Sequence, residues 1–204
     1  HLLNPDDYIY ISSKLHGTSF SMGRVKVKRK LSLWEKIKNV FKFPVVLTEY
    51  DDIYASRSVI KNATATQKNN DWYGEDVWKN TFEELKHLLV DGMQFYGEIV
   101  GFTPSGGGIQ KGWDYGCAPK EAKSYLYRIT STDEEGVVRE WDMSEVISYC
   151  KENNLNHVPV YYQGLARDLF PDLDLTNHWH RDFTERLRNS FNMEKNCELC
   201  KNKV

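Results

Sequence analysis

The sequence predicts an α+β fold with mixed, largely antiparallel sheets flanked by helices. Aromatic and β-branched runs typical of strands recur along the chain, and short glycine-containing turns join some of them directly. Apolar residues at helical spacing mark helices that stand apart from these strand pairs. No internal repeat is visible.

The chain of 204 residues is long enough for one substantial domain, and we treat residues 1–204 as one. Its apolar share of 40% and charged share of 27% are ordinary and exclude a disordered chain. The formal net charge of −2 neither indicates nor excludes a nucleic-acid binder, because a basic face can coexist with an acidic remainder. Since the chain starts at His1 and stops abruptly at Val204, we expect a fragment trimmed at both ends.

The lack of a membrane-spanning stretch, the lack of a signal peptide and the cysteine content suggest a location for the protein. No apolar stretch is long enough to span a membrane and no signal peptide is present, so we expect no membrane partner. Four cysteines in a chain of this size favour a reducing compartment, and we expect the cytoplasm. Cys197 and Cys200 form a single CxxC, which is a weak zinc signal because two further ligands are needed. The candidates for those ligands are Cys150, His157, His178 and His180.

The first elements are two strands with a lysine between them. Residues 8–11 (Tyr-Ile-Tyr-Ile) are typical of a strand, and residues 19–28 alternate between apolar and polar side chains. A short turn with Gly17 joins them, which places Lys14 at the mouth of a sheet. Residues 24–42 then carry eight basic side chains against one acid, Glu35. Such a run is either a solvated face or a surface for a phosphate backbone.

The middle of the chain predicts a helix, a buried strand and a loop. Phe82, Leu85, Leu88 and Leu89 recur at helical spacing, with Gly92 as the expected C-terminal cap. Residues 93–102 follow as a buried strand, and the glycine-rich residues 103–116 indicate a loop. Its three consecutive glycines lack the spacing of a P-loop.

The last third predicts a hairpin and two helices. Residues 125–130 form a strand, and the turn 133–136 leads into a second strand at 137–141. Asp142 and Glu145 form a capping pattern that begins a helix through about residue 153. Residues 159–162 are extended, and the four-residue spacing of Phe183, Leu187 and Phe191 marks a final helix.

Lys14, in the sequence Lys-Leu-His-Gly, is the strongest candidate for chemistry. A free lysine has a pKa of about 10.4, so a nucleophilic lysine must be desolvated or lie near cations that depress its pKa. A position between a buried strand and a glycine turn suits that need. The alternative is an ordinary surface lysine beside a turn.

Four elements in a fixed order resemble the covalent nucleotidyltransferases, the superfamily of DNA ligases, RNA ligases and mRNA capping enzymes. Residues 14–18 (KLHGT) resemble its first motif, and Ser56-Arg57 resembles the Ser-Arg element that follows. Residues 95–101 (FYGEIVG) are similar to its third motif, and residues 125–129 (YLYRI) are similar to the aromatic strand after it. The fold implied is a ligase adenylation domain of the nucleotidyltransferase, ATP-grasp-like type.

Within the superfamily, His16 is similar to the RNA ligases. Residues 109–116 and 157–162 resemble a phage or large-virus subgroup, so a viral protein in the host cytoplasm is expected. The resemblance implies an ATP-dependent RNA ligase with Mg²⁺ or Mn²⁺. Lys14 would attack the α-phosphate of ATP, AMP would pass to a 5′-phosphate RNA end, and a 3′-hydroxyl would seal the strand. The alternatives are a DNA ligase or capping-type enzyme, and a non-catalytic nucleic-acid-binding module.

The resemblance also assigns a role to several side chains around Lys14. His16 would position the ribose or a phosphate, Gly17 would let the nucleotide approach the backbone, and Arg57 would bind phosphate or a ribose hydroxyl. The same pocket would include Ser13 and Leu15.

Three further candidates each have a plainer alternative. Glu98 would accept from the ribose hydroxyls or hold a metal ion through water; otherwise it is a solvated acid at a strand end. Tyr127 would stack on adenine, although its pattern alone favours sheet core. Lys111 would reach phosphate, or it is a solvated loop lysine.

The sequence departs from the family pattern in three places. Ser19 follows the first motif where RNA ligases usually carry Asn, and Arg128 stands where many relatives have an acid. Residues 135–139 (EGVVR) imitate the fourth motif, but they follow Tyr127 too closely and predict a hairpin turn, so we treat them as a decoy. The true fourth and fifth motifs are then expected beyond Val204, and the chain alone is expected to lack the lysines that orient the triphosphate.

Overall fold

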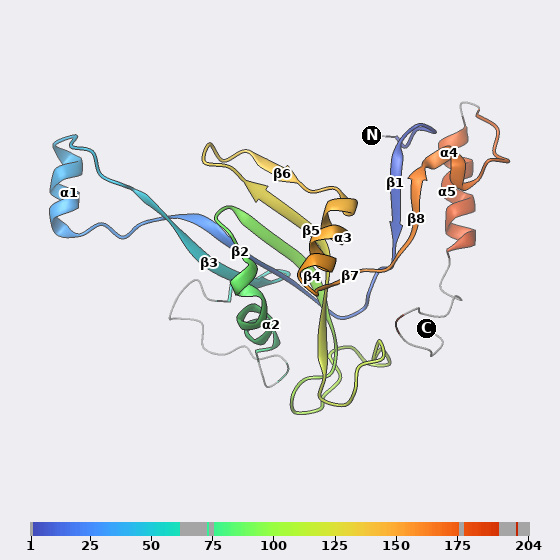
Figure 1. Cartoon of the computed structure of the whole chain (residues 1–204), viewed down its shortest axis with the longest axis horizontal. Coiled ribbons are helices and arrows are strands. Elements are labelled where there is room, and N and C mark those ends of the chain that lie inside the picture. The colour runs from blue at the N-terminus through green and yellow to red at the C-terminus, as the bar shows by residue number, and fades with distance from the viewer. Residues whose placement is uncertain (1, 62–72, 74–75, 176–177, 192–198, 200–204) are drawn as a thin grey trace. The chain divides into compact units, whose positions relative to one another are not determined.

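The computed structural model describes all residues except 1, 62–72, 74–75, 176–177, 192–198 and 200–204. The chain divides into two compact units (Figure 1). Unit 1 contains residues 1–17, 100–123 and 157–204, and unit 2 contains residues 18–99 and 124–156. Strands and helices occur in both, with antiparallel pairing in every ladder whose register is known, so the predicted α+β class is confirmed.

The larger sheet has six strands, most of them in unit 2. Its order is β3 (Thr48–Ser56), β2 (Thr18–Lys28), β4 (Met93–Gly101), β5 (Ala122–Thr132) and β6 (Val138–Glu140), with β7 (Asn156–His157) paired to β5. β3 was not predicted as a strand, whereas β2, β4, β5 and the β5–β6 hairpin lie where the sequence predicts them.

Strand β4 lies in the middle of the larger sheet, and its side chains alternate in burial from Met93 to Ile99. Phe95 and Ile99 are fully buried, whereas Tyr96 and Glu98 are half-buried. Gly97 between them is required by packing, since a Cβ there would lie 2.5 Å from the Phe20 ring and from the Tyr125 carbonyl oxygen.

Two helices supply the rest of the core of unit 2. The predicted middle helix begins earlier than expected, as α2 (Val77–Leu85), and continues into the short 3₁₀ helix η1 (Lys86–Leu88). Its Phe82 stacks on Tyr54 of β3 at 4.9 Å between ring centroids. α3 (Met143–Glu152) begins at the predicted Asp142–Glu145 capping box, and its Tyr149 contacts Phe95 at 5.7 Å between centroids.

The prediction of Gly92 as the cap of this helix is wrong. The 3₁₀ segment ends before it, at a cap formed by Leu89. Gly92 instead turns the chain into β4 with a φ of +81°, and its N–H donates to the Arg24 carbonyl oxygen at 2.8 Å. A Cβ at this position would lie 2.0 Å from the Thr132 carbonyl oxygen, so long-range packing rather than helix capping requires the glycine.

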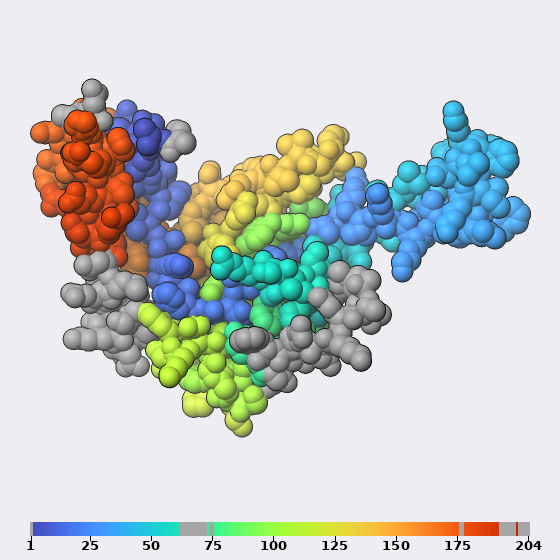
Figure 2. Space-filling view, turned by 180° about the vertical axis from the view of Figure 1, so that it is seen from behind, coloured from blue at the N-terminus to red at the C-terminus, as the bar shows by residue number. Residues whose placement is uncertain are grey.

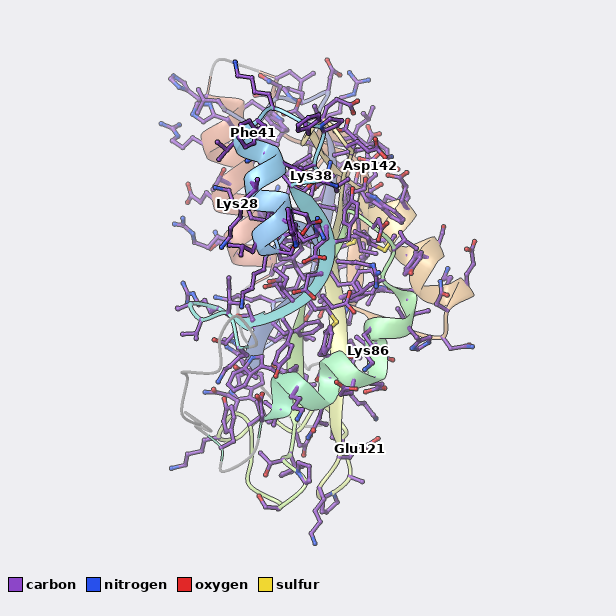
Figure 3. The ribbon with its side chains drawn as sticks, turned by 90° about the vertical axis from the view of Figure 1, so that its left-hand side faces the viewer. Lys28, Lys38, Phe41, Lys86, Glu121 and Asp142 are labelled. Carbon is purple, nitrogen blue, oxygen red and sulfur yellow. The ribbon has the colours of Figure 1, made fainter. Side chains whose placement is uncertain are left out.

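The β2–β3 hairpin carries a helix that the sequence analysis did not predict. The two strands pair from Phe20–Ser56 out to Lys28–Thr48, and α1 (Leu33–Val40) lies at the far end of this ribbon (Figure 1). Its signal was a capping box in which Ser32 and Glu35 satisfy each other's backbone N–H groups. Figure 3 labels Lys28, Lys38 and Phe41 on this part of the hairpin. No residue of α1 is buried.

Unit 1 contains a two-stranded antiparallel sheet of β1 (Tyr8–Ser12) and β8 (Val160–Leu165), both predicted as extended. The short helix α4 (Ala166–Leu169) was not predicted, whereas α5 (Trp179–Ser190) is the predicted last helix. Ala166, Trp179 and Phe183 form the centre of its core. Residues 103–116 form the predicted loop, and no described helix is long and apolar enough to cross a membrane.

Candidate active site

The segment that carries Lys14 is anchored from both sides within unit 1. It follows β1 directly, and the Ser13 N–H donates to the Pro159 carbonyl oxygen at 2.8 Å. The Tyr161 hydroxyl donates to the Ser13 hydroxyl at 3.2 Å, and the Leu15 side chain is buried. Because its neighbours on both sides are fixed, the exposed Lys14 side chain extends from a backbone with little freedom.

His16 is held by two aromatic residues of the loop that the sequence predicts. Its backbone N–H donates to the hydroxyl of Tyr115 at 2.7 Å, and Tyr115 is buried. Its ring lies 4.6 Å from the ring of Trp113, which in turn stacks on Tyr115 at 5.7 Å between centroids. The loop therefore folds back against the lysine segment and positions both the backbone and the ring of His16.

Neither Trp113 nor Tyr115 is among the site residues predicted from the sequence. The available signal was two aromatic residues within a glycine-rich loop, where large apolar side chains are unusual unless they pack against something. Lys111, the candidate named in that loop, is exposed and lies in the same unit as Lys14. Gly17 ends the segment, and β2 begins at the next residue.

Glu98 and Tyr127 form a second group of candidates, in unit 2. Glu98 is half-buried on β4, opposite Ser19 of β2 in the strand register. Tyr127 is 40% exposed, so the alternative of a plain core residue is wrong. Desolvation raises the pKa of Tyr127, and the negative charge of nearby Glu98 raises it further. The aromatic side chain and the carboxylate are therefore close enough to interact.

Arg128, the departure from the family pattern, has a structural explanation. Its guanidinium lies over the Tyr96 ring at 4.8 Å and pairs with Glu140 of β6 at 3.1 Å. It thus links β4, β5 and β6 instead of facing an open site. The predicted hairpin turn joins β5 to β6 over residues 133–137, where the Val137 N–H donates to the Asp133 carboxylate at 2.8 Å; Arg139 lies on β6 and pairs with Glu145.

Arg57 lies just beyond the end of β3 in unit 2 and is exposed. The turn in which it stands is closed by the Ser56 N–H, which donates to the Val59 carbonyl oxygen at 2.9 Å. The candidate residues thus fall into two groups. Ser13, Lys14, Leu15, His16, Gly17 and Lys111 belong to unit 1, and Arg57, Glu98 and Tyr127 belong to unit 2.

The described residues contain no cluster of three or more His, Cys, Asp or Glu side chains that could hold a metal ion. A single half-buried carboxylate, Glu98, fits Mg²⁺ or Mn²⁺ only if water and phosphate oxygens complete the coordination, as hard cations allow. Cys197 and Cys200, the possible zinc ligands, lie outside the described residues.

One of three comparisons with known proteins identifies a family. A search of curated protein sequences finds no significant match. Among solved structures, the chain is similar to a mutant RNA ligase of Naegleria gruberi with ATP and Mn, at 19% identity and a TM-score of 0.46. The match covers 88% of this chain and 41% of that ligase, so the chain spans less than half its length. A sequence model of the RNA ligase family matches residues 7–200, and the chain therefore belongs to the RNA ligase family.

Proposed function

We propose that residues 1–204 form the adenylation domain of an ATP-dependent RNA ligase and that Lys14 is its nucleophile. The observation that carries this proposal is an exposed lysine on an immobilised segment, two residues before a histidine held by Trp113 and Tyr115. A nucleophile held in a fixed geometry loses little freedom when the substrate arrives, which lowers the barrier to attack.

The first step forms one bond and breaks one. The neutral Lys14 amine attacks the α-phosphorus of ATP, a P–N bond forms, and pyrophosphate leaves with the electron pair of the broken P–O bond. An ammonium group has no lone pair, so Lys14 must lose a proton before attack. Because Lys14 is exposed, we expect the bound nucleotide to supply the desolvation that favours the neutral amine.

The remaining steps transfer the adenylate to RNA. A 5′-phosphate end attacks the lysyl-AMP phosphorus and releases the lysine, and a 3′-hydroxyl then displaces AMP to form the phosphodiester. His16 and Arg57 would orient the phosphates or the ribose, and Lys111 would neutralise phosphate charge. A divalent cation, Mg²⁺ or Mn²⁺, would stabilise charge on the phosphate oxygens.

Glu98 and Tyr127 would hold the nucleoside. The half-buried carboxylate suits ribose hydroxyls or metal-bound water, and the exposed ring beside it suits a stacked adenine. The pKa of Tyr127 is raised, so its hydroxyl stays neutral and adds no charge beside the nucleotide. Ser13, Leu15 and Gly17 would line the pocket with backbone.

A cytoplasmic location is part of the same proposal. Cys117 and Cys150 are buried free thiols, and burial raises the pKa of Cys150 to about 11. Buried, protonated thiols are stable in a reducing compartment and do not serve as a disulfide framework.

The decisive experiment is incubation with ATP labelled at the α-phosphate, followed by denaturing electrophoresis. We expect covalent label on the wild type and on Lys79→Ala, a matched exposed lysine of α2, but none on Lys14→Ala. The assay uses the natural protein in its full length. Absence of label from that protein, or label on its Lys14→Ala variant, would contradict the proposal.

End-joining assays separate RNA ligation from the alternatives. We expect sealing of strands with a 5′-phosphate and a 3′-hydroxyl when both are RNA. Sealing of DNA strands alone would indicate a DNA ligase, and transfer of a nucleotide to a diphosphate end without sealing would indicate a capping-type enzyme.

A further inference from the structure

The end of the β2–β3 hairpin exposes an unusual number of apolar side chains. We call residues 28–47 the tip; it contains α1 and the segments on both sides of it. Eight large apolar residues of the tip are exposed, and six of them are more than 60% exposed. They are Leu33, Trp34, Ile37, Val40, Phe41, Phe43, Val46 and Leu47. A patch of this kind on a folded protein marks an interaction surface.

The apolar residues of α1 form one stripe along the helix. Leu33, Trp34, Ile37 and Val40 occupy positions i, i+1, i+4 and i+7, which lie on the same side of an α-helix. Lys36 and Lys38 stand at the two edges of that stripe, one on each side. The polar remainder of the helix is Glu35 and Asn39. α1 is therefore amphipathic, although none of its residues is buried.

The tip is also strongly basic. It carries six basic residues and one acid, a net charge of +5, while the whole chain carries −2, so the remainder carries −7. Its acid, Glu35, pairs with Arg29. In the described part of the chain no carboxylate pairs with the other five cations, which are Lys28, Lys30, Lys36, Lys38 and Lys42. The space-filling view shows the tip projecting from unit 2 on the β2–β3 ribbon (Figure 2).

We propose that the tip binds an anionic lipid surface, with the apolar stripe of α1 inserted at the headgroup boundary and its lysines on lipid phosphates. A helix with aromatic and aliphatic residues on one side and lysines at its edges binds in this way, lying in the plane of the interface. The long lysine stems let the ammonium groups stay at headgroup level while the neighbouring rings are buried. No described helix could span a bilayer, and the expectation of no membrane partner concerned spanning segments and signal peptides, not binding at a membrane surface.

Two other occupants fit the tip less well. Single-stranded RNA would use the lysines and stack on Trp34 and the two phenylalanines, but it would leave Leu33, Val40 and Val46 in water without gain. Pairing between two tips would bring two +5 charges together, which opposes association. A bilayer accepts a projecting apolar helix of any shape and supplies the missing negative charge; the cytoplasmic leaflet is the anionic one.

The test is co-sedimentation of the protein with phosphatidylcholine vesicles that contain or lack phosphatidylserine. We expect binding to the anionic vesicles to exceed binding to the neutral ones by about tenfold, because lysines and apolar residues act together. Two double variants, Trp34→Ser with Phe41→Ser and Lys36→Glu with Lys38→Glu, should each reduce that binding by about tenfold. All four positions are exposed, so neither variant is expected to disturb folding.

Matched controls test whether vesicle binding depends on the tip itself or on the charge and exposed apolar residues of the protein in general. Lys79→Glu with Lys151→Glu makes the same change in net charge on exposed positions of α2 and α3. Val137→Ser with Val138→Ser removes two exposed apolar side chains at the start of β6. Both controls should retain binding within about twofold, since neither alters the tip.

Three results would overturn the proposal. The first is failure of the wild type to sediment with anionic vesicles. The second is equal loss of binding in the control variants. The third is sedimentation without vesicles, which would show self-association. A tip variant that loses binding to a short single-stranded RNA, while the wild type ignores vesicles, would assign the tip to RNA instead.

Discussion

Lys14 and the lysines of the tip are all exposed, yet the contacts that hold their segments differ completely. The Lys14 segment is fixed by contacts with residues far away in the sequence, including Tyr115 and Pro159. The tip is held by local contacts, chiefly the capping box of Ser32 and Glu35 and the pair of Arg29 with Glu35. The first arrangement suits one lysine with a defined reaction, and the second suits a surface whose residues act collectively.

The largest expected effect on the adenylation rate comes from removing the aromatic ring that lies beside His16. Trp113→Ala removes the ring beside His16, so we expect the rate of lysyl-AMP formation to fall by about thirtyfold, as positioning errors do. Trp113→Phe keeps a ring at that position and should recover most of the rate. The measurement is a single-turnover time course with α-labelled ATP.

Trp34→Ala of the tip is the matched control for that experiment. Its side chain is 73% exposed and lies on α1, a helix that carries no residue assigned to the nucleotide. The adenylation rate should stay within about twofold of the wild type. An equal fall in the adenylation rate of Trp113→Ala and Trp34→Ala would show that the contact of Trp113 with His16 does not contribute to catalysis.

A smaller effect is expected when one hydrogen bond of the lysine segment is removed. Tyr115→Phe leaves the His16 N–H without its acceptor in a partly buried place, which costs about 1–3 kcal/mol of unfolding free energy. Tyr161→Phe, which loses only an exposed bond to the Ser13 hydroxyl, should cost less. Urea unfolding of both variants measures the difference; a greater loss in Tyr161→Phe would show that Tyr115 does not hold the segment.

The sequence predicts strands and the lysine segment better than it predicts the contacts between them. Alternation and aromatic content suffice for β2 and β4, because burial of one face leaves a local pattern. The contact of Trp113 with His16 produces no local sequence pattern, because it joins residues almost a hundred positions apart. The exposure of Tyr127 could not be predicted from the sequence either, because a partly exposed strand residue and a buried one can occur in the same sequence pattern.

The helix α1 was missed for a different physical reason. The eight lysines and arginines of residues 24–42 predict a basic region, and this dominant charge pattern hides the capping pair of Ser32 and Glu35 that begins α1. A helix without a buried residue is also unusual, because most helices in proteins are stabilised by packing.

The pH dependence of α1 tests how local its stability is. The Arg29 side chain, followed by the Ser32 backbone and hydroxyl, lowers the pKa of Glu35 from 4.5 to about 2. A lowered pKa stabilises the folded form above the unfolded value of 4.5, and the contribution is lost as pH falls towards 2. We therefore expect the amide signals of α1 to lose helical shifts between these values in an NMR titration.

Helix α3 is the internal control for that titration. Its Glu145 also has a lowered pKa, caused first by Arg139 and then by the Asp142 backbone. Val146 and Cys150 are buried, however, so packing should keep α3 folded when Glu145 becomes protonated. Loss of α3 at the same pH as α1 would show that the two helices do not differ in how they are held.

The smallest expected effect concerns the hairpin that imitates the fourth family motif. Arg139 is exposed and pairs with Glu145 at 2.5 Å, so its guanidinium already serves the start of α3. Arg139→Gln should therefore leave lysyl-AMP formation within about twofold of the wild type, because exposed ion pairs contribute little. Arg57→Gln, in the exposed turn after β3, should slow the same reaction clearly if Arg57 binds phosphate. A loss in Arg139→Gln that matches the loss in Arg57→Gln would make residues 135–139 part of the nucleotide site, because the pair with Glu145 alone gives no reason for a change in adenylation rate.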